Sequence, residues 1–327
     1  MIKVGLVGLG GMGTVHWNNY KYIEDCRVVA AVGNSENDIR NAKSWDIPLF
    51  SDVNEMLDQT EVDVVDICTP TFLHYEHAKK SLSRGIHTFI EKPIALHKIQ
   101  AEELYQLAQE KGAILLVGQA VRFSKQNALL KELVRTEKYG KVLDAYFERL
   151  SAAPRWAVGG WMFDKSKSGL LVFDLHIHDL DLIVSIFGKP LSYSYTSAGN
   201  KNKAYKEQYR FTYKYGDFNI SAEAAWFNAS IPFMARWRVY FENAVVINDG
   251  VTVTAYQFDH DPYVFDTEEV NKIPTGINVP PTEMYLNELN HFISCIRENK
   301  KSDIIKKEEI FNVLEILEDV SFHSENE

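Results

Sequence analysis

The sequence has little of what marks several classes of protein. Its 327 residues include only three cysteines, Cys26, Cys68 and Cys295. An odd number of scattered cysteines does not build a disulfide framework, so we expect free thiols in a reducing, cytoplasmic compartment. No apolar run approaches the ~18 residues of a membrane span, and we expect no membrane partner. The apolar start of the chain is rich in glycine, which favours a strand over a signal peptide.

Positive charge is also scarce. Lysine and arginine total 35 residues against 45 aspartates and glutamates, which leaves a net charge of -10. Nucleic acids and anionic membranes attract positive surfaces, so this balance argues against both as partners. The rest of the composition, 46% hydrophobic and 24% charged, is typical of a globular protein. The length suits two domains.

The first part of the chain alternates apolar runs with helical stretches. Five runs, rich in β-branched residues, are expected to form buried strands: residues 2–8, 27–32, 62–68, 87–90 and 113–118. Strands that alternate with helices of this length predict a doubly wound parallel sheet, the Rossmann fold of the α/β class. We predict a dinucleotide-binding domain over residues 1–122 and a second domain over residues 123–327.

A glycine-rich motif follows the first strand directly. Residues 8–13 read Gly-Leu-Gly-Gly-Met-Gly, which is the G-x-G-x-x-G pattern in the context that gives it meaning. The first glycine allows a tight turn, the second lets a pyrophosphate approach, and the third lets helix pack on strand. The following helix offers its first N–H groups to phosphate. The residues predicted to hold the dinucleotide are Gly8, Gly10, Gly11, Met12 and Gly13.

The end of the second strand bears on cofactor choice. An acidic residue there would hold the ribose hydroxyls of NAD, but this chain has Asn34 and Ser35, followed by Arg40. Without a carboxylate, these three side chains could accept a 2′-phosphate, so the sequence leans towards NADP(H). Two alternatives stay open: Asn34 could bond a plain ribose, and Arg40 could be a solvated helix charge.

Two further strand ends carry polar residues. Thr69 and Pro70 follow the strand at 62–68, with His74 shortly after, and Glu91 and Lys92 close the strand at 87–90. Because ligands on such sheets bind beyond the carboxyl ends of the strands, we predict that these five residues contact the cofactor. Lys92 is placed to reach a substrate hydroxyl as well. The alternative is a surface lysine beside an ion-paired Glu91.

The second domain carries a carboxylate and an imidazole four residues apart. Asp174 and His178 lie in the stretch 169–181, GLLVFDLHIHDLD. On an α-helix this spacing points both side chains to one face, where the carboxylate can orient the imidazole as a base. His176 would lie ~200° around the helix from Asp174, which argues against a shared metal ion, and we predict no metal site. A buried structural pair is the alternative.

These motifs together resemble the Gfo/Idh/MocA oxidoreductase family. The similarity rests on GLGGMG, Thr69-Pro70 with His74, Glu91-Lys92-Pro93, the approach to Arg122, and the stretch around Asp174. It implies that Lys92, Asp174 and His178 form the catalytic group. The chain departs from the family pattern at Asn34, where NAD-dependent members have an acid, and at residues 119–121, where an asparagine is more usual.

Beyond the first domain the pattern turns to short strands with turn residues between them. Seven are expected, at 142–151, 192–197, 205–215, 218–226, 236–241, 244–248 and 251–258. They predict an α+β domain with a large, open, mostly antiparallel sheet. Several carry apolar residues on both faces, which predicts an apolar open face and a homodimer or homotetramer formed through it. Trp161, beside two glycines, would line a sugar-sized pocket or belong to the core.

The sequence therefore predicts an NAD(P)-dependent oxidoreductase acting on a secondary alcohol or ketone of a sugar, polyol or related small molecule. The predicted substrate-binding residues are Lys92, Arg122, Trp161, Asp174 and His178. Two alternatives remain, a non-catalytic NADP(H)-binding regulator and a glycosidase that keeps NAD bound and oxidises its substrate transiently.

Overall fold

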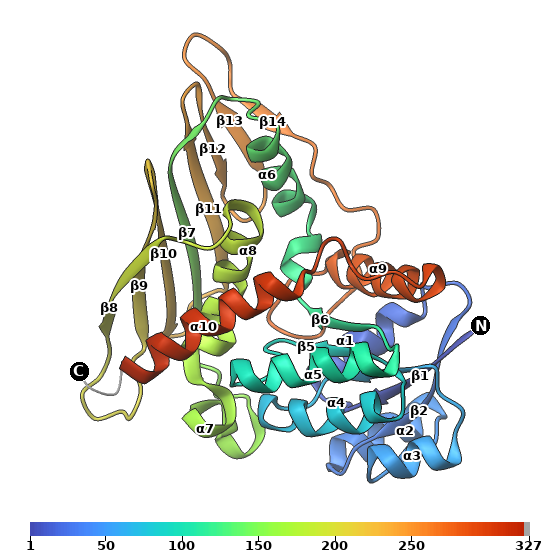
Figure 1. Cartoon of the computed structure of the whole chain (residues 1–327). Helices are drawn as coiled ribbons and strands as arrows, with labels where there is room; N and C mark the ends of the chain where they lie inside the picture. Colours follow the sequence, from blue (N-terminus) through green and yellow to red (C-terminus); the bar gives the residue numbers. More distant parts are fainter. Residues whose placement is uncertain (324–327) are drawn as a thin grey trace. The chain divides into compact units, whose positions relative to one another are not determined.

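The protein is described by a computed structural model covering residues 1–323 (Figure 1). Its contacts divide the chain into two compact units. The first unit comprises Met1–Phe123 and Val270–Leu314, and the second comprises Ser124–Glu269 and the chain from Glu315. The predicted boundary after residue 122 lies beside the first junction. Val270–Leu314, which the sequence reading assigned to the second domain, joins the N-terminal residues.

The first unit is built on a six-stranded parallel sheet. Its strands lie in the order β3-β2-β1-β4-β5-β6, and all neighbouring pairs are parallel. The chain adds strands outward from β1 to β3 on one side and then from β4 to β6 on the other. This is the order of a Rossmann fold, and it confirms the prediction. The strands are β1 Ile2–Val7, β2 Cys26–Val32, β3 Leu49–Phe50, β4 Val64–Ile67, β5 His87–Glu91 and β6 Leu115–Gly118.

The helices of the first unit include one from the far end of the chain. They are α1 Gly11–Tyr20, α2 Glu36–Trp45, α3 Val53–Gln59, α4 His74–Ser83, α5 Lys98–Lys111 and α9 Met284–Glu298, with short 3-10 turns η1 Thr71–Leu73 and η2 Ala120–Phe123. Helix α9 packs on α1 and η2, where Val15, Ala120 and Tyr285 form one apolar cluster. A helix about 270 residues later in the chain thus completes the core beside the glycine motif.

The second unit contains an eight-stranded sheet in the order β14-β13-β12-β11-β7-β10-β9-β8. Among the strand pairs of this sheet in the described residues, only β7 and β10, fifth and sixth in the order, are parallel, so the prediction of a mostly antiparallel sheet is confirmed. The strands are β7 Val142–Ala152, β8 Ser192–Ala198, β9 Gln208–Tyr215, β10 Phe218–Phe227, β11 Met234–Phe241, β12 Ala244–Asn248, β13 Val253–Tyr256 and β14 Tyr263–Phe265.

One face of this sheet is covered and the other is charged. On β11, Trp237 is buried and its indole N–H donates at 2.9 Å to Asn127 of helix α6 (Lys125–Arg135), whereas the neighbouring Arg236 and Arg238 are exposed. The open face also carries Glu223, which pairs with Arg210. The expectation of an apolar open face was therefore wrong, because apolar residues alternate with charged ones along these strands. The homo-oligomer stays a prediction.

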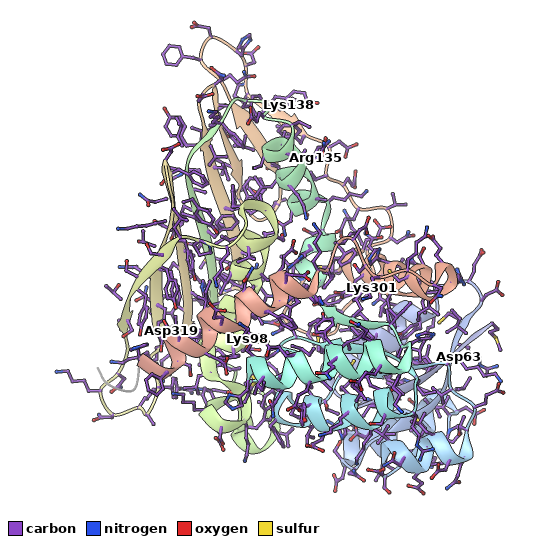
Figure 2. The ribbon with its side chains drawn as sticks, viewed as in Figure 1. Asp63, Lys98, Arg135, Lys138, Lys301 and Asp319 are labelled. Carbon is purple, nitrogen blue, oxygen red and sulfur yellow. The ribbon has the colours of Figure 1, made fainter. Side chains whose placement is uncertain are left out.

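The remaining helices of the chain are α6 Lys125–Arg135, α7 Lys165–Ser168, α8 Ile177–Phe187 and α10 Lys307–His323, with a 3-10 segment η3 Val158–Phe163 and a π-helical segment η4 Val172–His176. Charged side chains such as Asp63, Arg135 and Lys301 project from the surface (Figure 2). Within residues 1–323, no helix combines the length and apolar character needed to cross a membrane.

Candidate active site

The glycine motif has the geometry of a phosphate-binding turn. Gly8 adopts φ +86°, a left-handed conformation that favours glycine, and its N–H donates to the carbonyl of Val32 at 2.8 Å. A Cβ at Gly13 would lie 2.0 Å from the Gly8 carbonyl oxygen, so only glycine lets α1 pack this closely. At Gly10 a Cβ would meet nothing within 4 Å, and α1 begins there without a side-chain cap. The N-terminus of α1 is thus left open for an anion.

A buried aspartate that the sequence reading missed organises the adjacent loop. Asp38 accepts the N–H of Leu9 at 2.8 Å on one oxygen, and the N–H groups of Asn34 and Ser35 at 3.1 and 2.9 Å on the other. The Ser35 hydroxyl also donates to it, at 2.7 Å. Ser35 and Asp38 form the capping box of α2, and the Ser-x-x-Asp spacing was the signal in the sequence. Arg40 is exposed and bonds Asn37.

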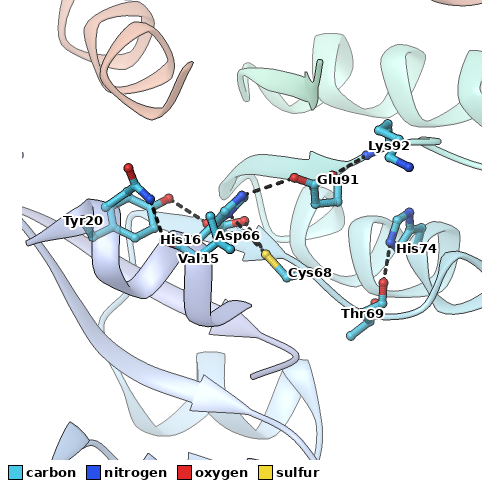
Figure 3. A network of polar contacts seen from close by, with 10 residues as sticks. Val15, His16, Tyr20, Asp66, Cys68, Thr69, His74, Glu91 and Lys92 are labelled. Atoms are coloured by element: carbon cyan, nitrogen blue, oxygen red, sulfur yellow. Dashed lines mark hydrogen bonds and ion pairs between the residues drawn. The ribbon is translucent and has the colours of Figure 1, made fainter. Parts of the chain in front are cut away.

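His74 links the ends of two strands. Its ring is buried, and its Nδ1 lies 2.7 Å from the Pro93 carbonyl. Its Nε2 lies 2.8 Å from the Thr69 carbonyl (Figure 3). Burial lowers the pKa of His74, although both carbonyl contacts oppose that fall. Thr69 and Pro70 remain half-buried at the edge of the sheet. His74, predicted to contact cofactor, holds Pro93 and therefore the chain next to Lys92.

Lys92 follows a strand whose last side chain reaches into the core. Glu91 is buried, its Oε2 accepts the Lys92 N–H at 3.1 Å, and its Oε1 lies 3.2 Å from Nε2 of His16 (Figure 3). The alternative expected a surface lysine beside an ion-paired Glu91; Glu91 is buried and faces a histidine of α1. Lys92 itself is half-buried. Nothing in the local sequence pattern pairs His16 with Glu91, because they lie on separate elements.

Three ligand-type atoms also gather in this core. His16, Asp66 and Cys68 bring a nitrogen, an oxygen and a sulfur within 4.8 Å of one another. The His16 Nδ1 lies 2.8 Å from Asp66 Oδ2, which is the distance of a hydrogen bond. The Cys68 thiol lies 3.3 Å from the same nitrogen, and burial raises its pKa. A metal ion held here would require Cys68 to lose its proton, because a metal-bound cysteine is a thiolate.

The stretch with Asp174 and His178 is not the continuous α-helix that its spacing predicts. Gly169, at φ +70°, ends α7, and Leu170 is also left-handed at φ 61°. A π-helical segment then runs over Val172–His176, where the N–H of Ile177 donates to the carbonyl of Val172, five residues back. The correction has a local cause, because the two left-handed residues restart the helix and its first turn is wide. Such π turns occur frequently at functional sites.

Asp174 and His178 nevertheless share one side of this segment. Of the residues from Leu171 to Val184, these two alone are partly exposed, and the others are buried. Their catalytic pairing stays a prediction.

The buried side of the segment is held by two polar contacts. His176 Nε2 lies 2.6 Å from the Tyr213 hydroxyl, and its ring stacks on Phe211 at 3.9 Å. Burial, assisted by the charge of Arg149, lowers the pKa of His176 to about 3. Asp179 accepts Arg149 Nη2 at 2.8 Å and Nε at 3.2 Å. His176 and Asp179 thus have structural partners within the second unit.

The two remaining predicted substrate residues differ in their surroundings. Arg122 is buried within the first unit, where it donates to the Ile304 carbonyl at 2.8 Å and pairs with Glu309. These contacts anchor η2 to the segment before α10. Trp161 is half-buried in η3 of the second unit, between Gly160 at φ 64° and the buried Met162. The predicted roles of Arg122 and Trp161 in substrate binding stay predictions.

Family profiles match both parts of the chain. The profile of an oxidoreductase family with an NAD-binding Rossmann fold matches residues 2–119, and that of a GFO/IDH/MocA C-terminal domain matches residues 128–247. The chain belongs to the Gfo/Idh/MocA oxidoreductase family. The resemblance drawn from the motifs is confirmed.

The curated proteins similar to this chain include a dehydrogenase and a hydratase. D-glucoside 3-dehydrogenase of Escherichia coli K12 is 30% identical over 200 residues, which is 58% of this chain and 55% of that protein. 2,7-anhydro-N-acetylneuraminate hydratase of Mediterraneibacter gnavus is 30% identical over 187 residues, 57% of this chain and 50% of that protein. The chain thus spans about half the length of the curated relatives it matches.

A solved levoglucosan dehydrogenase, in complex with NADH and levoglucosan, shares the Gfo/Idh/MocA fold over both units. It has a TM-score of 0.84 and 18% identity, over 99% of this chain and 97% of that chain. At that identity the likeness establishes the fold alone.

Proposed function

We propose that the protein is an NAD(P)-dependent oxidoreductase that interconverts a secondary alcohol and a ketone on a sugar, polyol or related small hydroxylated molecule. The observation that carries this proposal is the open N-terminus of α1 at Gly10. It is supported by the partly exposed pair Asp174 and His178. The names of the glucoside and levoglucosan dehydrogenases support a sugar-like substrate.

The residues of the first unit fit a dinucleotide. The turn from Gly8 to Gly13 would hold the pyrophosphate, because Gly10 leaves space and α1 offers N–H groups. Thr69, Pro70 and Lys92 at neighbouring strand ends would line its nicotinamide side. When bound, a nicotinamide dinucleotide supplies the hydride acceptor or donor that no protein side chain provides.

The chain's own residues would then manage the proton and the developing charge. In the oxidative direction, His178 takes the proton of the substrate hydroxyl, and Asp174 orients the imidazole and favours its charged form. The ammonium group of Lys92 bonds the reacting oxygen, makes the alcohol more acidic and stabilises negative charge on that oxygen. In the reductive direction the same groups return the proton.

The contacts of Asp38 bear on cofactor preference. Asn34 and Ser35 have already donated their backbone N–H groups, and the Ser35 hydroxyl, to the Asp38 carboxylate. These donors are not available to a 2′-phosphate, and a carboxylate behind them repels it. We therefore propose that NAD(H) binds at least as tightly as NADP(H), the reverse of the preference that the sequence favours.

The first experiment is a fluorescence titration of the purified protein with NADH and NADPH, followed by a screen of sugars and polyols using nicotinamide absorbance. Lys92→Ala and His178→Ala should each lower kcat by about 10²- to 10⁴-fold with little change in cofactor Kd. Lys98→Ala, which removes a lysine paired with Glu102 on α5, is the matched control. Full turnover in both variants, or binding of neither cofactor, would contradict the proposal.

The other two functions are less well supported. A non-catalytic NADP(H)-binding regulator has no need of Lys92, Asp174 and His178 together. A redox-assisted glycosidase, or a hydratase like one of the named relatives, would form product without net change in nicotinamide absorbance. Product analysis during the same screen separates these cases.

A further inference from the structure

The first unit contains a cluster of ionisable side chains in its core. His16 comes from α1, Asp66 from β4, Glu91 from β5 and Glu288 from α9. His16, Asp66 and Glu288 are fully buried, and Glu91 is 6% exposed. Charged groups are rarely buried to this extent unless each is paired. The cluster ends directly beneath the proposed catalytic Lys92.

His16 stands between two of the carboxyl groups (Figure 3). Its Nδ1 lies 2.8 Å from Asp66 and its Nε2 lies 3.2 Å from Glu91, although the second contact lacks the alignment of a hydrogen bond. An imidazole that faces a carboxylate with each nitrogen is most stable with both nitrogens protonated. Burial lowers the pKa of His16, but Asp66 and Cys68 outweigh that effect and the pKa is raised well above its usual value.

The same carboxyl group holds the chain at Lys92. While one oxygen of Glu91 faces His16, the other accepts the N–H of Lys92 at 3.1 Å. A shift of the Glu91 side chain therefore moves the backbone of the proposed catalytic lysine. Displacements of about 1 Å near reacting groups can lower turnover 10²-fold.

Charges in this cluster do not balance if all three carboxyl groups are ionised. One imidazolium would then face three carboxylates in a core that excludes water. Tyr20 donates to Asp66 at 2.9 Å and Lys92 donates its N–H to Glu91, so these two carboxylates have partners. Neither oxygen of Glu288 has a partner with strict hydrogen-bond geometry, although the backbone N–H of Gln119 lies near its carboxyl group. Ionisation of a buried carboxyl group without a well-aligned partner is the most costly of the three.

We propose that Glu288 keeps its proton in the native protein and that, with His16, it positions Glu91 and through it Lys92. Glu288 and His16 are thus positioning residues, and their link to turnover depends on the proposed function of Lys92. The charged groups that act on Glu288 are His16 from α1, Asp66 from β4 and Glu91 from β5. On η2, Arg122 pairs with Glu309.

A proton held by Glu288 makes the stability of the protein depend on pH. Burial, with the nearby charge of Glu91, raises the pKa of Glu288 well above its usual value, and the backbone N–H of Gln119 opposes this only in part. Above the unfolded pKa, the folded chain binds a proton that the unfolded chain has released. Stability contributed by this group is therefore full at acidic pH and is lost as the pH rises.

Glu288→Gln tests the proposal because an amide matches the shape of the neutral acid. We expect the variant to unfold at a higher temperature than the wild type at pH 8 to 9, with the difference vanishing near pH 5. Glu298→Gln, on the exposed end of the same helix, is the matched control and should show no such pH-dependent gain. A Glu288→Gln variant less stable than the wild type at every pH would show an ionised, paired carboxylate and overturn the proposal.

Two further measurements separate positioning from a purely structural role. Infrared spectroscopy should show the band of a buried protonated carboxylic acid that disappears in Glu288→Gln, and its absence from the wild type would overturn the proposal. In the wild type, kcat/KM should fall about tenfold per pH unit above the pKa of Glu288, and this fall should move to higher pH in the variant.

The outcomes distinguish the two proposals. A carboxylic-acid band together with an inactive protein would leave the assignment of the proton intact and contradict the proposed function. A metal ion that copurifies with the wild type and is lost in Glu288→Gln would overturn the proton assignment, because an ion would then balance the charge.

Discussion

The two units differ in how their buried charged side chains are paired. In the second unit, Arg149 and Asp179 match one to one with two short contacts, and the neighbouring His176 is neutral. In the first unit, His16 faces more carboxyl groups than it can neutralise. In the matched pair each charge has a counter-charge beside it, whereas the cluster leaves a carboxyl group without one. Burial still raises the pKa of Asp179 against the opposing charge of Arg149, so both cores respond to pH.

The largest expected effect comes from breaking the matched pair. Asp179→Ala leaves Arg149 buried without its carboxylate, and the free energy of unfolding in urea should fall by about 3–5 kcal/mol. Asp144→Ala, whose partner Arg238 lies 3.9 Å away near the surface, should leave the unfolding midpoint almost unchanged. Equal losses of unfolding free energy in the two variants would show that the buried pair contributes no more than the surface pair.

The neutral His176 predicts the opposite pH dependence from that of Glu288. Its pKa is about 3 in the folded protein, so below about pH 6.5 the unfolded chain binds a proton that the folded chain does not. Stability should fall as the pH falls from about 6.5 towards 3, by about 1.4 kcal/mol per unit from this residue. His176→Gln should lack that component of the slope in unfolding measured at several pH values. Equal slopes of stability against pH in the wild type and in His176→Gln would contradict this prediction.

The backbone of the π segment can be tested with two matched glycines. Gly169 and Gly159 have the same φ of +70°, but a Cβ at Gly169 would lie 2.4 Å from the Phe173 ring, and one at Gly159 would meet nothing within 4 Å. Both alanine variants carry the strain of a left-handed residue, and Gly169→Ala should lose about 1–3 kcal/mol more through overpacking. It should also lower kcat, because Phe173 adjoins Asp174. Identical stability of the two variants would contradict this.

Two tyrosines give the smallest effect and compare the networks directly. Tyr20 donates to the Asp66 carboxylate at 2.9 Å, and the Tyr213 hydroxyl lies 2.6 Å from the neutral His176. Replacement by phenylalanine should cost about 1.5–3 kcal/mol at Tyr20 and about 1 kcal/mol at Tyr213, because bonds to charged groups are stronger. Urea unfolding of both variants measures the difference, and a larger loss at Tyr213 would reverse the comparison.

Much of the first unit was predictable because its signals are local. The strand before Gly8, the glycine spacing and the alternation of apolar runs each depend on neighbours in the chain. The predicted strand at 87–90 is close to the observed β5, His87–Glu91. The short β3 and the role of Asp38 were missed, since a two-residue strand has no period and the contacts of Asp38 with Leu9 join distant parts of the chain.

The catalytic stretch shows where local reasoning is insufficient. A four-residue spacing predicts a shared face on an α-helix, and the shared exposure of Asp174 and His178 agrees with it. The π turn follows Gly169 and Leu170 in left-handed conformations, and the four-residue spacing gives no sign of either one. Likewise, the alternation of arginines with apolar residues on β11 shows which face is open only after Trp237 is seen to contact Asn127.

By itself, the sequence determined the Rossmann topology, the glycine turn and the candidate residues Lys92, Asp174 and His178, because each rests on periodicity or spacing along the chain. Only the tertiary structure decided that His16, Asp66, Glu91 and Glu288 meet in one core, since they come from four elements separated by up to 272 positions in the numbering. Whether a carboxyl group is ionised depends on the dielectric and the charges around it. Those surroundings exist only once the chain has folded.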